Sequence, residues 1–311
     1  MARAQRIASF LASGTEIVAA LGMSSRLVAI SHECDYPPEV LGRPRLSRPR
    51  FDPAGLSSGA IDAAVRAALG EHGSVYEIDR DTLLQVRPDL VLTQAVCEVC
   101  AVPTAGVRDV VAGSGLAARV LSLDAHTIGG ILDTIAEVGA AAGVPGEART
   151  LIESLRARLA AVRAGVGNAP RPRVLAIEWL EPPFAPGHWV PEMIEAAGGT
   201  SLVGAAGAPS RQVAWSDLAG LDPDVLIVMP CGYGLEASRA EAARFATELD
   251  RIAPRAIADG RAFAVDGSSY FNRSGPRVVT GVEILATLLH PERFPAPVPG
   301  ADPGATARLS W

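Results

Sequence analysis

The chain contains the same local pattern twice, and this repeat limits the folds that it can adopt. Residues 84–94 read LQVRPDLVLTQ and residues 218–230 read LAGLDPDVLIVMP, so each copy runs from a helix end through a Pro-Asp turn into an apolar strand. A second pair of similar segments, IASF at 7–10 and VLAI at 174–177, begins each half. The repeat predicts two similar α/β lobes. Because ligands of such lobes bind beyond the carboxyl ends of parallel strands, we expect a cleft lined by the loops that follow the strands.

Apolar runs of strand length alternate with helical patterns in both halves, which is typical of parallel β-α-β units. The expected strands are 6–10, 26–31, 89–94 and 119–123 in the first half, and 173–177, 224–229 and 262–266 in the second. From Pro145 onward, apolar residues recur at helical spacing with arginines between them, which predicts a helix of roughly 20 residues between the lobes. A last helix is expected from Val278 to His290.

The predicted fold class is therefore α/β, with two Rossmann-like lobes that contain parallel sheets and are joined by one long helix. The expected divisions are an N-terminal α/β lobe at 1–127, a helical segment with the interlobe helix at 128–168, a C-terminal α/β lobe at 169–292, and a Pro/Gly-rich tail at 293–311. Since a tail of that composition buries little apolar surface, we expect it to be a surface strap or disordered.

Composition excludes several classes of function. Of 311 residues, 49% are hydrophobic and 20% are charged, which is the balance of a globular protein, and the net charge of -6 argues against nucleic acid and anionic membranes as partners. All 28 basic residues are arginine. Without lysine the chain can form neither a Walker-type phosphate site nor a Schiff base nor a pyridoxal anchor.

The first residues resemble an export signal only superficially. Arg3 and Arg6 precede an apolar stretch, but Glu16 interrupts it and no small-residue cleavage pattern follows. We therefore expect cytoplasmic localisation, with an exported chain whose signal has been trimmed as the alternative. No apolar run approaches the roughly 20 residues that span a bilayer, so direct membrane insertion is not expected.

All four cysteines fall in loops that follow predicted strands. They are Cys34, Cys97, Cys100 and Cys231. The C-x-x-C spacing of the middle pair can supply two thiolate ligands to zinc or to an iron-sulfur cluster, and His32 could replace one cysteine. Contact with an organic ligand and a purely structural role are the two other interpretations.

Aromatic residues are scarce, at 5%, yet several gather in the same kind of loop. Rings offer flat, stiff apolar contact to a planar ligand, and nearby polar groups can bind its edge. The ring candidates are Tyr36, Trp179, Phe184, Trp189, Tyr233, Tyr270 and Phe271, and the polar candidates are His32, His188, Asn272 and Arg273. The alternative is that Trp179 and Trp189 only brace a Pro-rich loop.

Two motifs suggest enzymes but are better explained otherwise. The segment Gly55–Gly59 matches a nucleophile elbow, but it lacks the preceding strand that strains the serine, so we interpret Ser57 as part of a helix cap. Gly232-Tyr-Gly234 opens a helix after a strand, but the acidic residue that a dinucleotide site requires is not well placed. Hydrolase and dehydrogenase functions are disfavoured.

Five segments together carry a resemblance to a known family. They are SGTEI at 13–17, HECDYPP at 32–38, PDLVLTQ at 88–94, GHWVPE at 187–192 and YFNRSGPR at 270–277. With them the chain resembles the cobalamin-binding solute receptors of ABC importers, over residues 6 to 292. The resemblance implies two Rossmann-like lobes joined by a long helix, a corrinoid in the cleft, no catalysis, and an ABC transporter membrane subunit as partner. The cysteine loops, and the lack of a recognisable export signal or lipid-anchoring cysteine, depart from that pattern.

Two hypotheses from different classes follow. The first is a non-catalytic receptor for cobalamin or a related corrinoid, held between rings that include Trp179, Trp189, Tyr270 and Phe271. The second is a cytosolic protein in which the four cysteines hold a metal or an iron-sulfur cluster.

Overall fold

The computed structural model describes residues 4–96, 99 and 101–311. Two compact units make up the fold. The first comprises Met1–Ala125, Gly129–Ser154 and Ser274–Pro276, and the second comprises His126–Ile128, Leu155–Arg273 and Arg277–Trp311. The two units are described separately below.

A four-stranded parallel sheet forms the centre of the first unit, in the order β2-β1-β5-β6. Its strands are β1 (Ile7–Ser9), β2 (Leu27–Ile30), β5 (Leu90–Thr93) and β6 (Arg119–Ser122). Each lies within a strand expected from the sequence. All four residues of β5 are buried, because a central parallel strand is covered on both faces.

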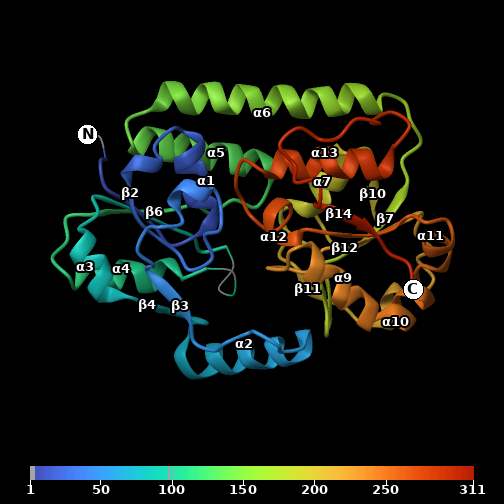
Figure 1. Ribbon diagram of the computed structural model, residues 1–311, viewed down its shortest axis with the longest axis horizontal. Helices are drawn as coiled ribbons and strands as arrows, with labels where there is room; N and C mark the ends of the chain where they lie inside the picture. The colour runs from blue at the N-terminus through green and yellow to red at the C-terminus, as the bar shows by residue number, and fades with distance from the viewer. Residues whose placement is uncertain (1–3, 97–98, 100) are drawn as a thin grey trace. The chain divides into compact units, whose positions relative to one another are not determined.

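Helices cover both faces of this sheet (Figure 1). On one side lie α1 (Ala12–Ala20) and α5 (Ile128–Ala141), and on the other lie α3 (Arg80–Val86) and α4 (Thr104–Ala112). A core of apolar side chains, among them Phe10, Leu83 and Val107, fills the space beneath them. Two short 3-10 helices, η1 (Ser24–Arg26) and η2 (Pro38–Val40), flank β2.

An antiparallel pair of short strands, β3 (Ser47–Pro49) and β4 (Tyr76–Ile78), is connected by helix α2 (Ser58–His72). The hydroxyl of Ser57 accepts a hydrogen bond from the backbone N–H of Ala60 at 3.1 Å and so caps α2. The helix-cap interpretation of the Gly55–Gly59 motif is therefore confirmed.

A five-stranded sheet forms the centre of the second unit, in the order β10-β7-β12-β13-β14. Its strands are β7 (Arg173–Ile177), β10 (Thr200–Ser201), β12 (Val225–Val228), β13 (Ala262–Val265) and β14 (Thr306–Arg308). The first four are parallel, and β14 runs antiparallel to β13. A smaller antiparallel sheet follows β7 and consists of β8 (Trp179–Leu180), β9 (Pro183–Ala185) and β11 (Arg211–Gln212).

Strand β14 corrects one expectation from the sequence. The tail was expected to be a surface strap or disordered, but its last residues add an edge strand to the sheet. The backbone N–H of Asp302 also donates a hydrogen bond to the Tyr270 hydroxyl at 2.8 Å, and Leu309 is buried. Backbone pairing and a single buried leucine anchor a segment whose composition suggests no order.

Helices cover this second sheet as well (Figure 1). Helices α7 (Val190–Ala196) and α13 (Val278–Leu289) lie on one side, and α9 (Leu235–Arg244), α10 (Ala246–Ile252) and α11 (Pro254–Ala258) lie on the other. Two one-turn helices, α8 (Trp215–Leu218) and α12 (Gly267–Tyr270), complete the unit. Its core includes Leu175, Leu226 and Leu249.

The predicted long helix is α6 (Pro145–Val166), with 22 residues. At 1.5 Å per residue it is about 33 Å long. Residues of α6 up to Ser154 belong to the first unit and those from Leu155 to the second. Among the described residues, no helix combines the length and the apolar character needed to cross a bilayer.

Candidate functional site

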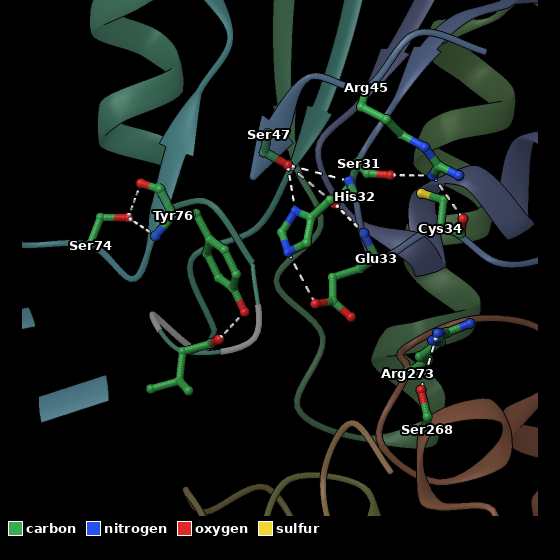
Figure 2. A network of polar contacts seen from close by, with 11 residues as sticks. Ser31, His32, Glu33, Cys34, Arg45, Ser47, Ser74, Tyr76, Ser268 and Arg273 are labelled. Atoms are coloured by element: carbon green, nitrogen blue, oxygen red, sulfur yellow. Dashed lines mark hydrogen bonds and ion pairs between the residues drawn. The ribbon is translucent and has the colours of Figure 1, made fainter. Parts of the chain in front are cut away.

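In the first unit, the loop after β2 is held in shape by one arginine. The guanidinium of Arg45 donates hydrogen bonds to the carbonyl oxygens of Ser31 at 2.7 Å and Cys34 at 2.8 Å (Figure 2). The thiol of Cys34 is buried, and its Sγ lies 3.1 Å from the Thr15 hydroxyl. Tyr36, two residues further on, is 44% exposed. The loop thus turns its cysteine inward and its tyrosine toward solvent.

His32 connects this loop to two other segments of the same unit. Its Nδ1 lies 2.8 Å from the hydroxyl of Ser47, and its ring centroid lies 4.8 Å from that of Tyr76. Its Nε2 lies 3.1 Å from a Glu33 carboxylate oxygen, although the two atoms are not aligned as a hydrogen bond. The Tyr76 hydroxyl in turn donates to the carbonyl oxygen of Val99 at 2.5 Å (Figure 2). Since Ser47 is buried, this serine-histidine-glutamate row is not a hydrolytic triad open to substrate.

In the second unit, the loops after β7, β12 and β13 are linked to one another. The rings of Trp179 and Tyr233 meet edge to face with centroids 5.3 Å apart. The backbone N–H of Cys231 donates to the Glu178 carbonyl oxygen at 3.0 Å, and that of Ser268 donates to the Tyr233 carbonyl oxygen at 3.0 Å. Trp179, Tyr233 and Cys231 are all partly exposed. Together these segments form an aromatic edge that follows the carboxyl ends of β7, β12 and β13.

Further predicted residues border this edge. Phe184 is partly exposed and pairs with Trp179 across strands β8 and β9. Asn272 and Arg273 are also partly exposed, and the Arg273 guanidinium donates to the Ser268 hydroxyl at 3.1 Å (Figure 2). The edge therefore combines flat apolar surface with a cationic group.

Three predicted stacking rings are instead buried. Trp189 is 7% exposed, Tyr270 is 4% and Phe271 is 0%. The indole N–H of Trp189 donates to the Phe271 carbonyl oxygen at 2.6 Å, so even its polar atom is used internally. The expectation that these rings offer their faces to a ligand is corrected, because their position after a strand does not determine the direction of the side chain.

His188 lies against a histidine that the sequence analysis missed. The Nδ1 atoms of His188 and His126 are 3.4 Å apart, and both residues belong to the second unit. Burial, together with the neighbouring His126, lowers the pKa of His188 below its ordinary value. Residue 126 follows β6 closely, so its place after a strand was the available signal.

Glu178 is another missed residue. Its carboxylate accepts a hydrogen bond from the Ser210 hydroxyl at 2.9 Å, and Ser210 accepts one from the backbone N–H of Gly187 at 3.1 Å. Burial raises the pKa of Glu178 to about 7, against the lowering effect of hydrogen bonding to its carboxylate from the Ser210 hydroxyl and the Gly187 backbone N–H. Its place directly after the apolar run of β7 could have indicated it.

The predicted four-cysteine site stays a prediction. Cys97 and Cys100 lie outside the described residues, while Cys34 belongs to the first unit and Cys231 to the second. Within the described part of the chain, no group of three or more His, Cys, Asp or Glu residues is arranged to hold a metal.

Comparison with known proteins identifies the family. A model of the periplasmic binding protein family matches residues 7–251, which is most of the chain. The chain belongs to the periplasmic binding protein family. A vitamin B12-binding protein of Vibrio cholerae is 22% identical, over 92% of this chain and 89% of that protein. The uncharacterized ABC transporter substrate-binding lipoprotein YvrC of Bacillus subtilis is also 22% identical, over 93% of this chain and 81% of that protein.

Solved structures agree with the fold. A periplasmic heme binding protein from Pseudomonas aeruginosa matches this chain with a TM-score of 0.68 at 22% identity, over 93% of each chain. The predicted α/β class with parallel sheets is confirmed, as is the resemblance to solute receptors of ABC importers. The chain is a substrate-binding protein without catalytic function.

The similar proteins do not define which ligand this chain binds, but their names do give information on localisation. The names of the similar proteins include vitamin B12 and heme as ligands, so the family defines a binding role without defining its ligand. The relatives are periplasmic proteins or lipoproteins, which does not support the cytoplasmic expectation and agrees with the exported alternative. Nor do these comparisons support an iron-sulfur or zinc cofactor.

Proposed function

We propose that this member of the periplasmic binding protein family binds cobalamin or a related corrinoid and delivers it to the membrane subunits of an ABC importer. The observation that carries the proposal is the Trp179–Tyr233 pair, whose rings are partly exposed beyond the carboxyl ends of β7 and β12. Rings in that position offer flat contact to a planar macrocycle. The vitamin B12-binding relative, which covers nearly the whole chain, supports the choice of ligand.

The polar groups of this edge suit the rim of a corrinoid. Glu181 is exposed in the turn between β8 and β9, and Arg273 is partly exposed beside Ser268. A carboxylate accepts hydrogen bonds from the amide N–H groups on that rim, and a guanidinium donates to the amide carbonyl oxygens.

We also propose that the protein works outside the cytoplasm. An importer receptor must meet its ligand before the ligand crosses the membrane, and the named relatives are periplasmic proteins or lipoproteins. Fractionation of the source cells, with the protein detected by antibody, tests this point. Recovery only with the cytoplasmic fraction would contradict it.

Replacing Trp179 tests the proposed binding edge. Trp179→Ala removes one ring of the pair, and we expect it to weaken cyanocobalamin binding about tenfold or more, since large aromatic contacts contribute about 1.5 kcal/mol or more at binding surfaces. Isothermal titration calorimetry measures the change. The matched control is Trp311→Ala, which removes a tryptophan that is 47% exposed near the C-terminus.

The control variant is expected to bind cyanocobalamin like the unmodified protein. If Trp179→Ala binds cyanocobalamin as tightly as the unmodified protein does, Trp179 does not contact the ligand. If the unmodified protein binds hemin but not cyanocobalamin, the proposed corrinoid ligand is wrong.

A further inference from the structure

Two histidines in the second unit stand close enough to share one metal ion. The Nδ1 atoms of His126 and His188 are 3.4 Å apart, and their ring centroids are 5.5 Å apart. The segment that carries His126 is tied to α7, because the backbone N–H of Ile128 donates to a Glu192 carboxylate oxygen at 2.7 Å. Both imidazoles are therefore positioned by the same unit.

The backbone holds His188 in an uncommon conformation. Its φ is 50°, a left-handed value that residues other than glycine adopt rarely. Its N–H donates to the Ala208 carbonyl oxygen at 2.6 Å, and its carbonyl oxygen accepts from the Gly207 N–H at 2.8 Å. A Cβ on the preceding Gly187 would lie 2.3 Å from the Ser210 nitrogen, so the turn is closely packed. Strain that the surrounding packing maintains is typical of functional positions.

The separation of the two nitrogens matches one coordination geometry. Zinc-nitrogen bonds are about 2.0–2.1 Å long, so two nitrogen ligands of a tetrahedral ion stand about 3.4 Å apart. Two axial ligands of a planar macrocycle would stand about 4.1 Å apart on opposite sides of its metal. The observed 3.4 Å fits two neighbouring ligands of a tetrahedral ion and not the two axial positions of a heme or corrinoid.

We propose that His126 and His188 bind a divalent transition metal ion of tetrahedral preference, such as Zn²⁺, through their Nδ1 atoms. The two remaining coordination positions are open to water or to a donor group of a bound molecule. In the metal-free form one Nδ1 must carry a proton toward the other, and the ion takes the place of that proton. This proposal does not rest on the proposed corrinoid function.

The chemistry of the two rings suits this role. Metals bind imidazole through an unprotonated ring nitrogen, and the two Nδ1 atoms lie 3.4 Å apart. His126 is exposed, which gives an ion access from solvent. The buried ring of Trp189 packs against the His188 ring, with centroids 5.8 Å apart.

Calorimetric titration of the full chain with Zn²⁺ tests the proposal. We expect one ion per chain, and we expect His126→Asn and His188→Asn each to weaken binding at least about tenfold, since even outer-shell changes cost 10- to 100-fold. Asparagine is chosen at 188 because it tolerates a positive φ. The matched control is His72→Asn, an exposed histidine at the end of α2 in the first unit.

A second readout reports the geometry. Co²⁺ in place of Zn²⁺ should give the intense visible bands of a tetrahedral ion, and these bands should be lost in the two variants and kept in the control. Thermal unfolding of each variant verifies that it is folded. Zinc binding that survives in the double variant His126→Asn/His188→Asn, or that disappears on Cys97→Ser/Cys100→Ser instead, would overturn the proposal.

Cyanocobalamin titration of His126→Asn separates the two proposals. We expect the cyanocobalamin affinity of this variant to change less than about twofold while its zinc binding is lost, because His126 is not among the residues proposed to contact the corrinoid. Loss of zinc binding with intact cyanocobalamin binding supports the metal site alone. If the unmodified protein binds zinc at the histidine pair but does not bind cyanocobalamin, the metal site is supported and the proposed corrinoid function is contradicted.

Discussion

At the scale of the residue, burial after β7 raises the carboxyl pKa of Glu178 to about 7. A raised pKa means that the folded state holds the proton more tightly than the unfolded state does. The contribution of Glu178 to stability is therefore fully present below its unfolded pKa of 4.5 and is lost as the pH rises through about 7.

Glu178→Gln should remove this dependence. A glutamine can still accept the hydrogen bond from Ser210 but cannot ionise, so we expect the variant to be more stable than the unmodified protein at pH 8, by up to about 3 kcal/mol, and similar to it at pH 4. Urea unfolding at the two pH values measures the difference. Glu181→Gln, an exposed residue nearby, is the control and should show no such gain. A Glu178 variant that is less stable at pH 8 would contradict the assignment.

The sequence could predict which residues follow strands but not how their side chains are directed. Trp179 and Tyr233 stay partly exposed, whereas Trp189 and Phe271 are buried, although all four follow or lie near predicted strand ends. The difference arises from contacts with distant segments. The hydrogen bond from the Trp189 indole joins residues 82 positions apart, and no local pattern encodes such a contact.

At the scale of the element, local rules account for most of the secondary structure. The apolar runs that predict β1, β5, β7 and β12 correspond to strands, and the Pro145 start of α6 agrees with the preference for proline in the first turn of a helix. Strand β14 could not be predicted, because only pairing with β13 makes its three residues extended.

The cap of α2 gives a prediction at this scale. Ser57→Ala removes the hydroxyl that accepts from the Ala60 N–H, and we expect a loss of about 1 kcal/mol in the free energy of unfolding. Thermal or urea unfolding measures it. Ser58→Ala is the matched control, since the buried Ser58 hydroxyl has no hydrogen-bond partner among the described residues, and this change should be neutral or slightly stabilising. A larger loss of stability in Ser58→Ala than in Ser57→Ala would contradict the capping role of Ser57.

At the scale of the whole molecule, the internal repeat was the most informative signal. It predicted two α/β units, and two compact units, each with a mainly parallel sheet, are present. The exchange of short segments between units could not be predicted. His126–Ile128 belongs to the second unit and Ser274–Pro276 to the first, because tertiary packing outweighs position in the chain. His126 thus belongs to the same unit as His188, and their Nδ1 atoms are 3.4 Å apart.

The central claim is that this member of the periplasmic binding protein family takes a corrinoid as its ligand. Equilibrium dialysis of the purified chain against cyanocobalamin, with hemin as competitor, tests that claim most directly, because the absorption of cyanocobalamin reports its distribution. We predict saturable binding of one cyanocobalamin per chain that excess hemin does not displace. No retention of cyanocobalamin above a protein-free control, together with saturable binding of hemin, would contradict it.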